Sequence, residues 1–166
     1  MKKAIVCIVA IATLVLATAC GNKQKTRDEQ VMEFTSELTS QDTTTMLNLC
    51  DQAMEQLKNK RIDDVLANLY EYTDSTKEVK PLSKATAAQY RRMFKMFPVL
   101  EYHRKYFSFQ LEGCNDVKYD VVWATAEAAG TEEPARTAYM FNPVKIDGTW
   151  HLCVKTLSDD IDPHIQ

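Results

Sequence analysis

The sequence lacks the short motifs that mark several large classes of enzyme. It has no P-loop, GxGxxG, HExxH or GxSxG pattern, and these patterns bind nucleotides, hold a catalytic zinc or carry a nucleophilic serine. Nucleotide-driven chemistry and the common hydrolytic reactions are therefore not expected. A basic stripe is also missing, because 20 Lys and Arg residues stand against 23 Asp and Glu residues. No nucleic-acid partner is indicated.

Paired cysteines are absent as well. The five cysteines are Cys7, Cys20, Cys50, Cys114 and Cys153, and no two have the CxxC spacing typical of zinc sites. The first two belong to the N-terminal leader described below, and the remaining three are too few for a disulfide framework. We expect buried or unpaired thiols, with a single bridge between Cys114 and Cys153 as the alternative. No metal or other cofactor is predicted.

The first twenty residues have the pattern of an export signal. The chain opens with Met1-Lys2-Lys3, continues with an apolar run from Ala4 to Leu16, and then has the small residues Ala17-Thr18-Ala19. A basic start, a short apolar segment and a small-residue cleavage site make up a secretory signal peptide. The run is too short to span a bilayer comfortably, which takes about 20 apolar residues. Residues 1–19 are therefore predicted to be a signal peptide.

The residue after this segment is Cys20. Leu16-Ala17-Thr18-Ala19-Cys20-Gly21 resembles the lipobox of bacterial lipoproteins, in which the cysteine is lipidated and becomes the first mature residue. Ala17 departs from the pattern, since leucine is commoner there, and a plain secreted protein is the alternative. The resemblance implies durable attachment to a membrane, because each buried CH₂ contributes about 0.8 kcal/mol and a lipoprotein carries several chains. Gly21 resembles sorting to the outer membrane, and we expect the protein to face the periplasm.

The mature chain is the size of one domain. Removal of the signal leaves 147 of the 166 residues, with 18 basic and 23 acidic side chains, and one domain with a proper core is expected. Residues 20–43 are predicted to be the lipidated cysteine and a linker. The polar stretch Gly21–Asp28 is expected to act as a flexible spacer, and Val31, Phe34 and Leu38 permit a short helix before Thr39–Thr44 interrupts it. The domain is expected to span 44–166.

Helical periodicity dominates the first half of the domain. One stripe of apolar residues consists of Met46, Leu49, Cys50, Ala53, Met54 and Leu57, and a second consists of Ile62, Val65, Leu66 and Leu69. Asp42, Thr43 or Thr44 is expected to cap the first helix. Tyr72–Leu82 is predicted to be a loop. Ser83 is expected to cap a third helix that runs to Phe97, where Pro98 ends it.

The second half changes to the two-residue period of strands. Strands are predicted over Tyr102–Leu111, Val117–Trp123, Thr137–Ile146 and Thr149–Leu157. Asp147-Gly148 predicts a type I′ hairpin turn, which places Lys145 opposite Trp150. Opposed residues share a face, so one wall of the sheet is predicted to contain Tyr139, Phe141, Trp150, Leu152 and Val154. The other face is predicted to carry Met140, Asn142, His151, Cys153 and Lys155.

These elements predict an α+β fold, with N-terminal helices packed on a curved antiparallel sheet of about four strands. Gln56–Tyr70 resembles the helix–turn–helix that opens nuclear-transport-factor-like domains, the ketosteroid-isomerase and SnoaL-like superfamily. Val144–Leu152 resembles the hairpin near their end, and the whole chain is similar to small lipoproteins of the Bacteroidetes. The resemblance implies a cone with an open mouth, a natural site for a small molecule. A cystatin-like or unrelated α+β domain is the alternative.

Enzymes of this superfamily place an Asp, His or Tyr inside the cone. His103 shares its strand parity with Phe107 and is expected to point inward, as are Tyr119 and Tyr139. An unperturbed imidazole has a pKa near 6.5 and is suited to general acid–base catalysis. The alternative is that the tyrosines are core residues and His103 lies at a solvated rim. Asp120 is predicted to face solvent, so no inward Asp matches the family's catalytic position.

The favoured function is a non-catalytic, lipid-tethered module that binds a small apolar molecule or an envelope protein. The candidate ligand-binding residues are Tyr90, Phe94, Trp123, Phe141 and Trp150. The alternative is a small isomerase- or dehydratase-like enzyme that uses a His and a Tyr of the pocket. The superfamily resemblance also implies a homodimer through the outer face of the sheet, for which Met140, Val144 and Cys153 supply apolar surface.

The C-terminal segment Ser158–His164 has three carboxylates and a histidine within seven residues. Such a set can bind a divalent cation, but no glycine shapes it as in an EF-hand loop. A solvated acidic tail is the favoured interpretation.

Overall fold

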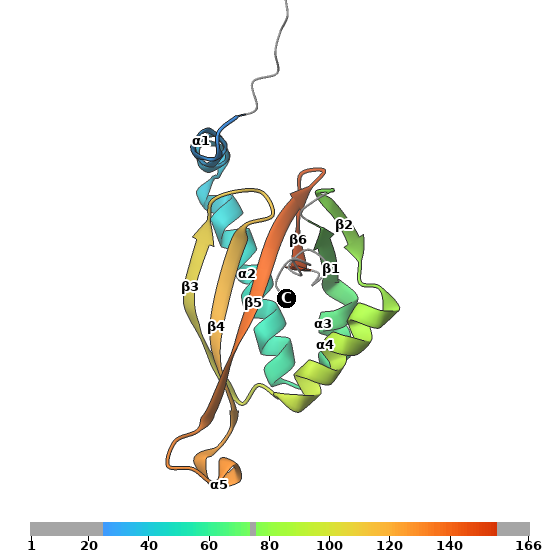
Figure 1. The fold of residues 1–166 in the computed structure, drawn as a ribbon, viewed down its shortest axis with the longest axis vertical. Coiled ribbons are helices and arrows are strands. Elements are labelled where there is room, and N and C mark those ends of the chain that lie inside the picture. The colour runs from blue at the N-terminus through green and yellow to red at the C-terminus, as the bar shows by residue number, and fades with distance from the viewer. Residues whose placement is uncertain (1–24, 74–75, 156–166) are drawn as a thin grey trace, which may run out of the picture.

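The computed structural model describes residues 25–73 and 76–155, which form an α+β fold, as predicted (Figure 1). The helices are α1 (Arg27–Glu37), α2 (Ser40–Lys58), α3 (Ile62–Asn68), α4 (Lys84–Met96) and the short α5 (Ala126–Ala129). The strands are β1 (Leu69–Thr73), β2 (Glu78–Pro81), β3 (Glu101–Phe109), β4 (Asn115–Ala124), β5 (Ala135–Ile146) and β6 (Thr149–Lys155).

The two helical stripes form α2 and α3, but α2 starts earlier than predicted and α3 ends at Asn68, so that Leu69 of the second stripe begins β1 instead. Thr39 is its N-cap, because its hydroxyl accepts from the backbone N–H of Asp42 while the Asp42 carboxylate accepts from the backbone N–H of Thr39. Such a reciprocal capping box stabilises the first turn. Thr39 therefore caps α2, and the polar residues from Ser40 to Thr44 belong to the helix and do not break it. The helix crosses the expected domain boundary at residue 44.

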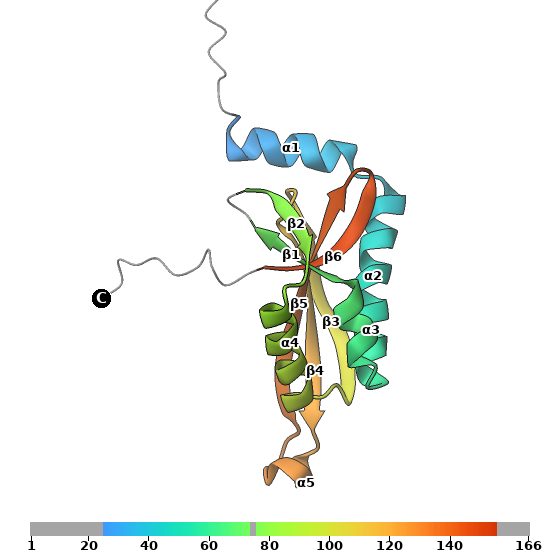
Figure 2. The ribbon, with the colours of Figure 1, turned by 90° about the vertical axis from the view of Figure 1, so that its right-hand side faces the viewer.

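The short helix predicted around Val31 and the helix predicted after Ser83 are both present, but α1 begins at Arg27, inside the stretch predicted to be a flexible spacer. Helix α1 contains Val31 and Phe34, and it includes Asp28 from the predicted spacer. Ser83 caps α4, and its hydroxyl accepts from the backbone N–H of Thr86 at 3.1 Å. Figure 2 shows α1 lying across the top of the domain, above the ends of β2 and β6. None of its residues is buried.

The sheet has six strands in the order β2-β1-β6-β5-β4-β3, and it is mixed. The expectation of about four strands is therefore too low. The expectation of an antiparallel sheet is wrong for one pair, because β1 and β6 are parallel. The segment Tyr72–Leu82, predicted to be a loop, contains the end of β1 and all of β2. Strand β1 runs parallel to β6 and pairs from Leu69 opposite Leu152 onward.

The predicted hairpin between β5 and β6 is confirmed. Asp147 and Gly148 have φ values of 47° and 80°, as a type I′ turn requires. Lys145 lies opposite Trp150 and Pro143 lies opposite Leu152. The predicted apolar wall is buried, and its members Tyr139, Phe141, Leu152 and Val154 pack in the main core with Cys50, Met54, Leu57 and Val65 from the helices.

The opposite face of the β5–β6 hairpin is largely buried and does not simply face solvent. Met140 is exposed there, but Asn142, Val144 and Cys153 are buried, and Tyr72 packs with the last two in a second small core. The turn between β3 and β4 covers this region, since a Cβ added to Gly113 would lie 2.2 Å from the Tyr72 hydroxyl. Burial of both faces explains why simple alternation failed to predict this core.

Candidate functional site

The structure brings four of the predicted site residues together in one groove. Tyr90 and Phe94 of α4 line it with Tyr139 and Phe141 of β5, and its volume is about 280 Å³. The ring centroids of Phe94 and Tyr139 lie 5.4 Å apart in an edge-to-face arrangement, and those of Tyr90 and Phe94 lie 5.8 Å apart. Aromatic pairs prefer this geometry. The walls of the groove are therefore largely aromatic.

The groove exists because β6 pairs with only part of β5. The two strands pair only between Ile146 and Asn142, and from Leu152 onward β6 also follows β1. On the edge of β5 that faces away from β4, the residues from Ala135 to Phe141 consequently have no partner among the described strands. Helix α4 lies along this opening (Figures 1 and 2). Because the groove lies at the edge of β5, residues from both faces of this strand line it, and Ala138 and Met140 are among them.

The lining is mainly apolar. Met93 and Met140 add flexible thioether side chains, and Lys118 is the one charged residue that lines the groove in the described part of the chain. Tyr139 donates its hydroxyl proton to the backbone carbonyl of Phe97, and burial raises the pKa of Tyr139 to about 12. Its phenol therefore stays protonated and bonded to the protein at neutral pH. The groove offers contact area and one cation instead of an acid–base pair.

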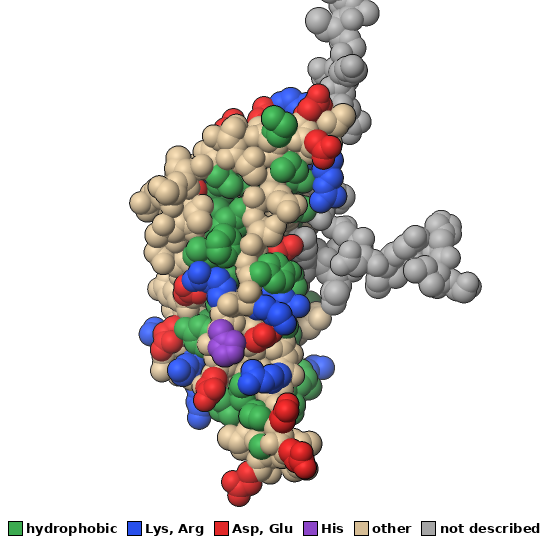
Figure 3. Space-filling model, turned by 90° about the vertical axis from the view of Figure 1, so that its left-hand side faces the viewer, with side chains coloured by type: hydrophobic (Ala, Val, Ile, Leu, Met, Phe, Trp, Pro, Cys, Tyr) green, Lys and Arg blue, Asp and Glu red, His purple; other side chains and the backbone are tan. Residues whose placement is uncertain are grey.

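The other catalytic candidates lie elsewhere. His103 is exposed and lies opposite Asp120 on the outer face of the sheet. A register shift between Arg104 and Tyr106 reverses the side-chain alternation of β3, so His103 does not share the face of Phe107. Figure 3 views the side of β3, where charged side chains of both signs surround a histidine. The structure does not bring His103 to any inward tyrosine.

Tyr119 faces inward, as predicted, and is fully buried. Its hydroxyl donates to the Asp51 carboxylate at 2.5 Å, and Arg104 pairs with the same carboxylate. Burial, followed by the neighbouring Asp51, raises the pKa of Tyr119 far above its usual range. This network fastens α2 to β3 and β4. The role of Asp51 could not be predicted from the sequence, because its partners lie 53 and 68 positions away.

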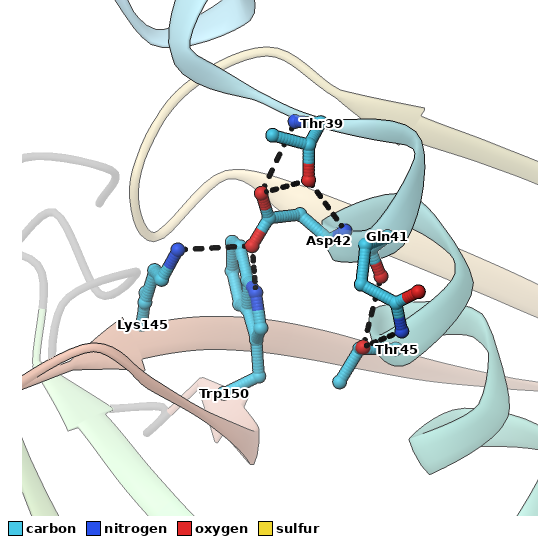
Figure 4. Close-up of polar contacts among 6 residues, drawn as sticks. All are labelled: Thr39, Gln41, Asp42, Thr45, Lys145 and Trp150. Atoms are coloured by element: carbon cyan, nitrogen blue, oxygen red, sulfur yellow. Dashed lines mark hydrogen bonds and ion pairs between the residues drawn. The ribbon is translucent and has the colours of Figure 1, made fainter.

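The two tryptophans also lie apart from the groove. Trp123 packs edge-to-face on Phe97, with centroids 5.3 Å apart. Trp150 donates from its indole Nε1 to the Asp42 carboxylate at 2.8 Å, and Lys145 donates to the same oxygen at 2.9 Å (Figure 4). Hydrogen bonds from Thr39, Lys145 and Trp150 hold the pKa of Asp42 well below its usual range. Asp42 thus links the start of α2 to the β5–β6 hairpin.

The cysteines that the structure describes are free thiols. Cys50 and Cys153 are buried and Cys114 is half-buried, so no bridge joins Cys114 to Cys153. Burial raises the pKa of Cys153 to about 12 and raises that of Cys50 further. A thiol that stays protonated is a poor nucleophile. These residues behave as small apolar side chains.

Several predictions concern residues that the structure does not describe. Cys20 and the segment Ser158–His164 lie outside the described ranges. Within those ranges, no group of three or more His, Cys, Asp or Glu residues is placed to hold a metal ion. No described helix is both long enough and apolar enough to cross a membrane.

Comparison of the chain with protein-family models, with curated proteins and with solved structures gave no match.

Proposed function

We propose that this protein is an exported lipoprotein, held at the outer membrane by a lipid on Cys20 and facing the periplasm, whose domain binds a small apolar molecule. The observation that carries the binding function is the groove formed by Tyr90, Phe94, Tyr139 and Phe141. Ligand sites are concave and mostly apolar, with a few polar groups that orient the ligand. Lys118 is such a group here, and it favours a ligand with an acidic end.

The proposal includes membership of the nuclear-transport-factor-like superfamily. It is supported by the helical hairpin of α2 and α3 and by a curved sheet that wraps the long helix α2 (Figure 2). Under this proposal the opening beside β5 would be the mouth of the cone. A non-catalytic role fits better than an isomerase- or dehydratase-like one, because His103 lies on the outer face while Tyr119 and Tyr139 are bonded to Asp51 and Phe97.

The binding function is tested with methionine-methyl NMR, using octanoate as the probe and the mature chain with Cys20→Ser. Met93 and Met140 line the groove, whereas Met32 is 72% exposed on α1, far from it in sequence. Octanoate is expected to shift the Met93 and Met140 signals and to leave Met32 unchanged. Neutral octanol is expected to bind more weakly, since it cannot pair with Lys118.

A variant that fills the groove provides the control. Ala138→Phe places a ring on the exposed edge of β5 inside the groove and is expected to abolish the octanoate shifts. Ala88→Phe adds the same ring to an exposed position of α4 that does not line the groove, and it is expected to bind as the parent does. Equal binding by both variants would rule out the groove as the site.

The anchor is tested separately by mass spectrometry of the native protein. A chain that begins at Cys20 and carries several acyl groups is expected, and Cys20→Ala should remove both the acyl groups and membrane association. An unmodified thiol at this position would disprove the tether.

A second candidate function is a homodimer through the outer face of the sheet. Of the three residues expected to supply apolar surface, Val144 and Cys153 are buried, and only Met140 is available. Tyr106, Lys118 and Met140 lie side by side across β3, β4 and β5, and Tyr106 and Met140 are both large and exposed. Light scattering of the parent and of Tyr106→Glu would show whether this row joins two copies.

A further inference from the structure

A second cleft lies where α2 and α3 meet the first residues of β6. It has a volume of about 270 Å³ and is enclosed by α2, α3, the start of β1 and the residues Thr149 to Leu152 of β6. Its floor is apolar, formed by the buried side chains of Ala53, Val65 and Leu152. It shares no lining residue with the aromatic groove, so it is a separate site.

Amide side chains stand along its rim. Gln52 and Gln56, one turn apart on α2, both line the cleft. Neither makes a side-chain hydrogen bond to any residue in the described ranges 25–73 and 76–155. Asn68 uses its Nδ2 on the Asp64 carbonyl, which leaves its Oδ1 as an acceptor. Each amide offers both donors and acceptors, and most of that capacity is not used within the described part of the protein.

The main chain of β6 adds a further donor and acceptor. In a two-residue hairpin, Ile146 and Thr149 form the hydrogen-bonded pair beside the turn, and such pairs alternate along the ladder. Trp150 and Lys145 are the next pair, so the backbone N–H and C=O of Trp150 point away from β5. The ladder with β1 begins only at Leu152. No described strand faces these groups of Trp150, and Trp150 is one of the residues that line the cleft.

No carboxylate, ammonium or guanidinium group lines the cleft in the described part of the chain. Its ionisable rim groups are the His151 and Tyr70 rings, which pack edge-to-face at 4.7 Å. A charged ligand would lose its hydration here without an opposite charge to replace it, which is costly. The occupant must therefore be neutral and rich in hydrogen-bonding groups.

From this chemistry we infer that the cleft binds a neutral saccharide unit. A sugar ring presents hydroxyl groups that both donate and accept around its edge, as the amides and the Trp150 backbone require. Its C–H face is apolar and suits the floor of Ala53, Val65 and Leu152. The volume of about 270 Å³ lies just below the usual range for ligand pockets, about 300–1,000 Å³, which restricts the occupant to about one ring.

The test uses the mature chain with Cys20→Ser and saturation-transfer NMR, so that its result does not depend on the lipid anchor. Glucose and N-acetylglucosamine are the neutral probes, and glucuronate and glucosamine are the same ring with a negative or a positive charge. Saturation transfer to the neutral sugars is expected, with affinities at least about tenfold higher than those for the charged rings. Binding of the charged rings alone, or of no sugar, would refute the saccharide assignment.

Paired substitutions locate the binding. Gln52→Leu with Gln56→Leu removes two amides from partly exposed positions with little change in size, and it should weaken binding of the neutral sugars about tenfold or more. Gln41→Leu, at an exposed position of α2 outside the cleft, should bind like the parent. Circular dichroism checks that both variants fold. Unchanged affinity in the folded double variant would overturn the site, whatever the result for octanoate in the aromatic groove.

Discussion

The carboxylate of Asp42 accepts a hydrogen bond from the indole N–H of Trp150 across 108 positions of sequence, at 2.8 Å (Figure 4). The other oxygen of the same carboxylate accepts from the backbone N–H and the hydroxyl of Thr39. One side chain therefore both caps α2 and fixes the helix to the hairpin of β5 and β6. Since α2 walls the second cleft and β6 forms its edge, this contact also sets the shape of that cleft.

Replacing Asp42 by Asn should destabilise the protein. An amide has only one acceptor oxygen, so it can serve Thr39 or the pair Lys145 and Trp150 but not both. The Asp42 side chain is only 15% exposed, and the expected loss in unfolding free energy is about 1–2 kcal/mol. Urea denaturation gives this value. Asp28→Asn, in the exposed first turn of α1, is the control, and an equal effect there would contradict the role of Asp42.

The same carboxylate should make stability depend on pH under acidic conditions. The pKa of Asp42 is lowered in the folded state, whereas an unfolded Asp has a pKa of about 3.9. As the pH falls below about 4, the unfolded chain binds a proton that the folded chain does not, and folding loses free energy. The difference in unfolding free energy between the parent and Asp42→Asn should thus be largest near neutral pH and decrease below pH 4. A constant difference down to acid unfolding would exclude this linkage.

Local signals in the sequence were sufficient for the elements that depend on neighbouring residues. Asp147-Gly148 fixed its own turn because a type I′ turn demands positive φ at both positions, and the register of Lys145 with Trp150 followed. The cap at Ser83 and the stop before Pro98 likewise depend on adjacent residues. The grouping of Tyr90 and Phe94 with Tyr139 and Phe141 required only correct helix and strand faces.

Long-range contacts and irregularities determine what the sequence did not reveal. Strands β1 and β2 are short, and β1 is stabilised by parallel pairing with β6, more than 80 positions away. The register shift near Arg104 turns His103 outward, and a bulge of this kind leaves no clear pattern in a single sequence. The second cleft was missed because it depends on where the β1–β6 ladder starts.

Alkaline conditions should reveal the buried phenols. Burial raises the pKa of Tyr139 to about 12, and burial and Asp51 raise that of Tyr119 still more, whereas an unfolded Tyr ionises near pH 10. The unfolded state therefore loses protons first, and stability should fall as the pH rises above about 10. Tyrosinate absorbance should show a late phase that only unfolding completes. Tyr139→Phe should make this phase smaller, and a titration of all the tyrosines in one early step would contradict the burial.

The last prediction concerns Gly113, in the turn that covers the second core. Its φ is +79°, and an added Cβ would lie 2.2 Å from the hydroxyl of Tyr72. Gly113→Ala must therefore strain the backbone and also push Tyr72 out of its packed position against Val144 and Cys153. Positive φ costs about 1–2 kcal/mol in a non-glycine residue, and overpacking adds about 1–3 kcal/mol.

Gly130 provides a matched control for this substitution. Its φ is +66°, but no atom lies within 4 Å of the position of an added Cβ, so Gly130→Ala tests the backbone cost alone. Thermal or urea unfolding of the two variants should show that Gly113→Ala loses clearly more stability, and the difference measures the contact with Tyr72. If both variants lose the same amount, the turn does not press on Tyr72, and burial of the second core must come from the pairing of β1 with β6 instead.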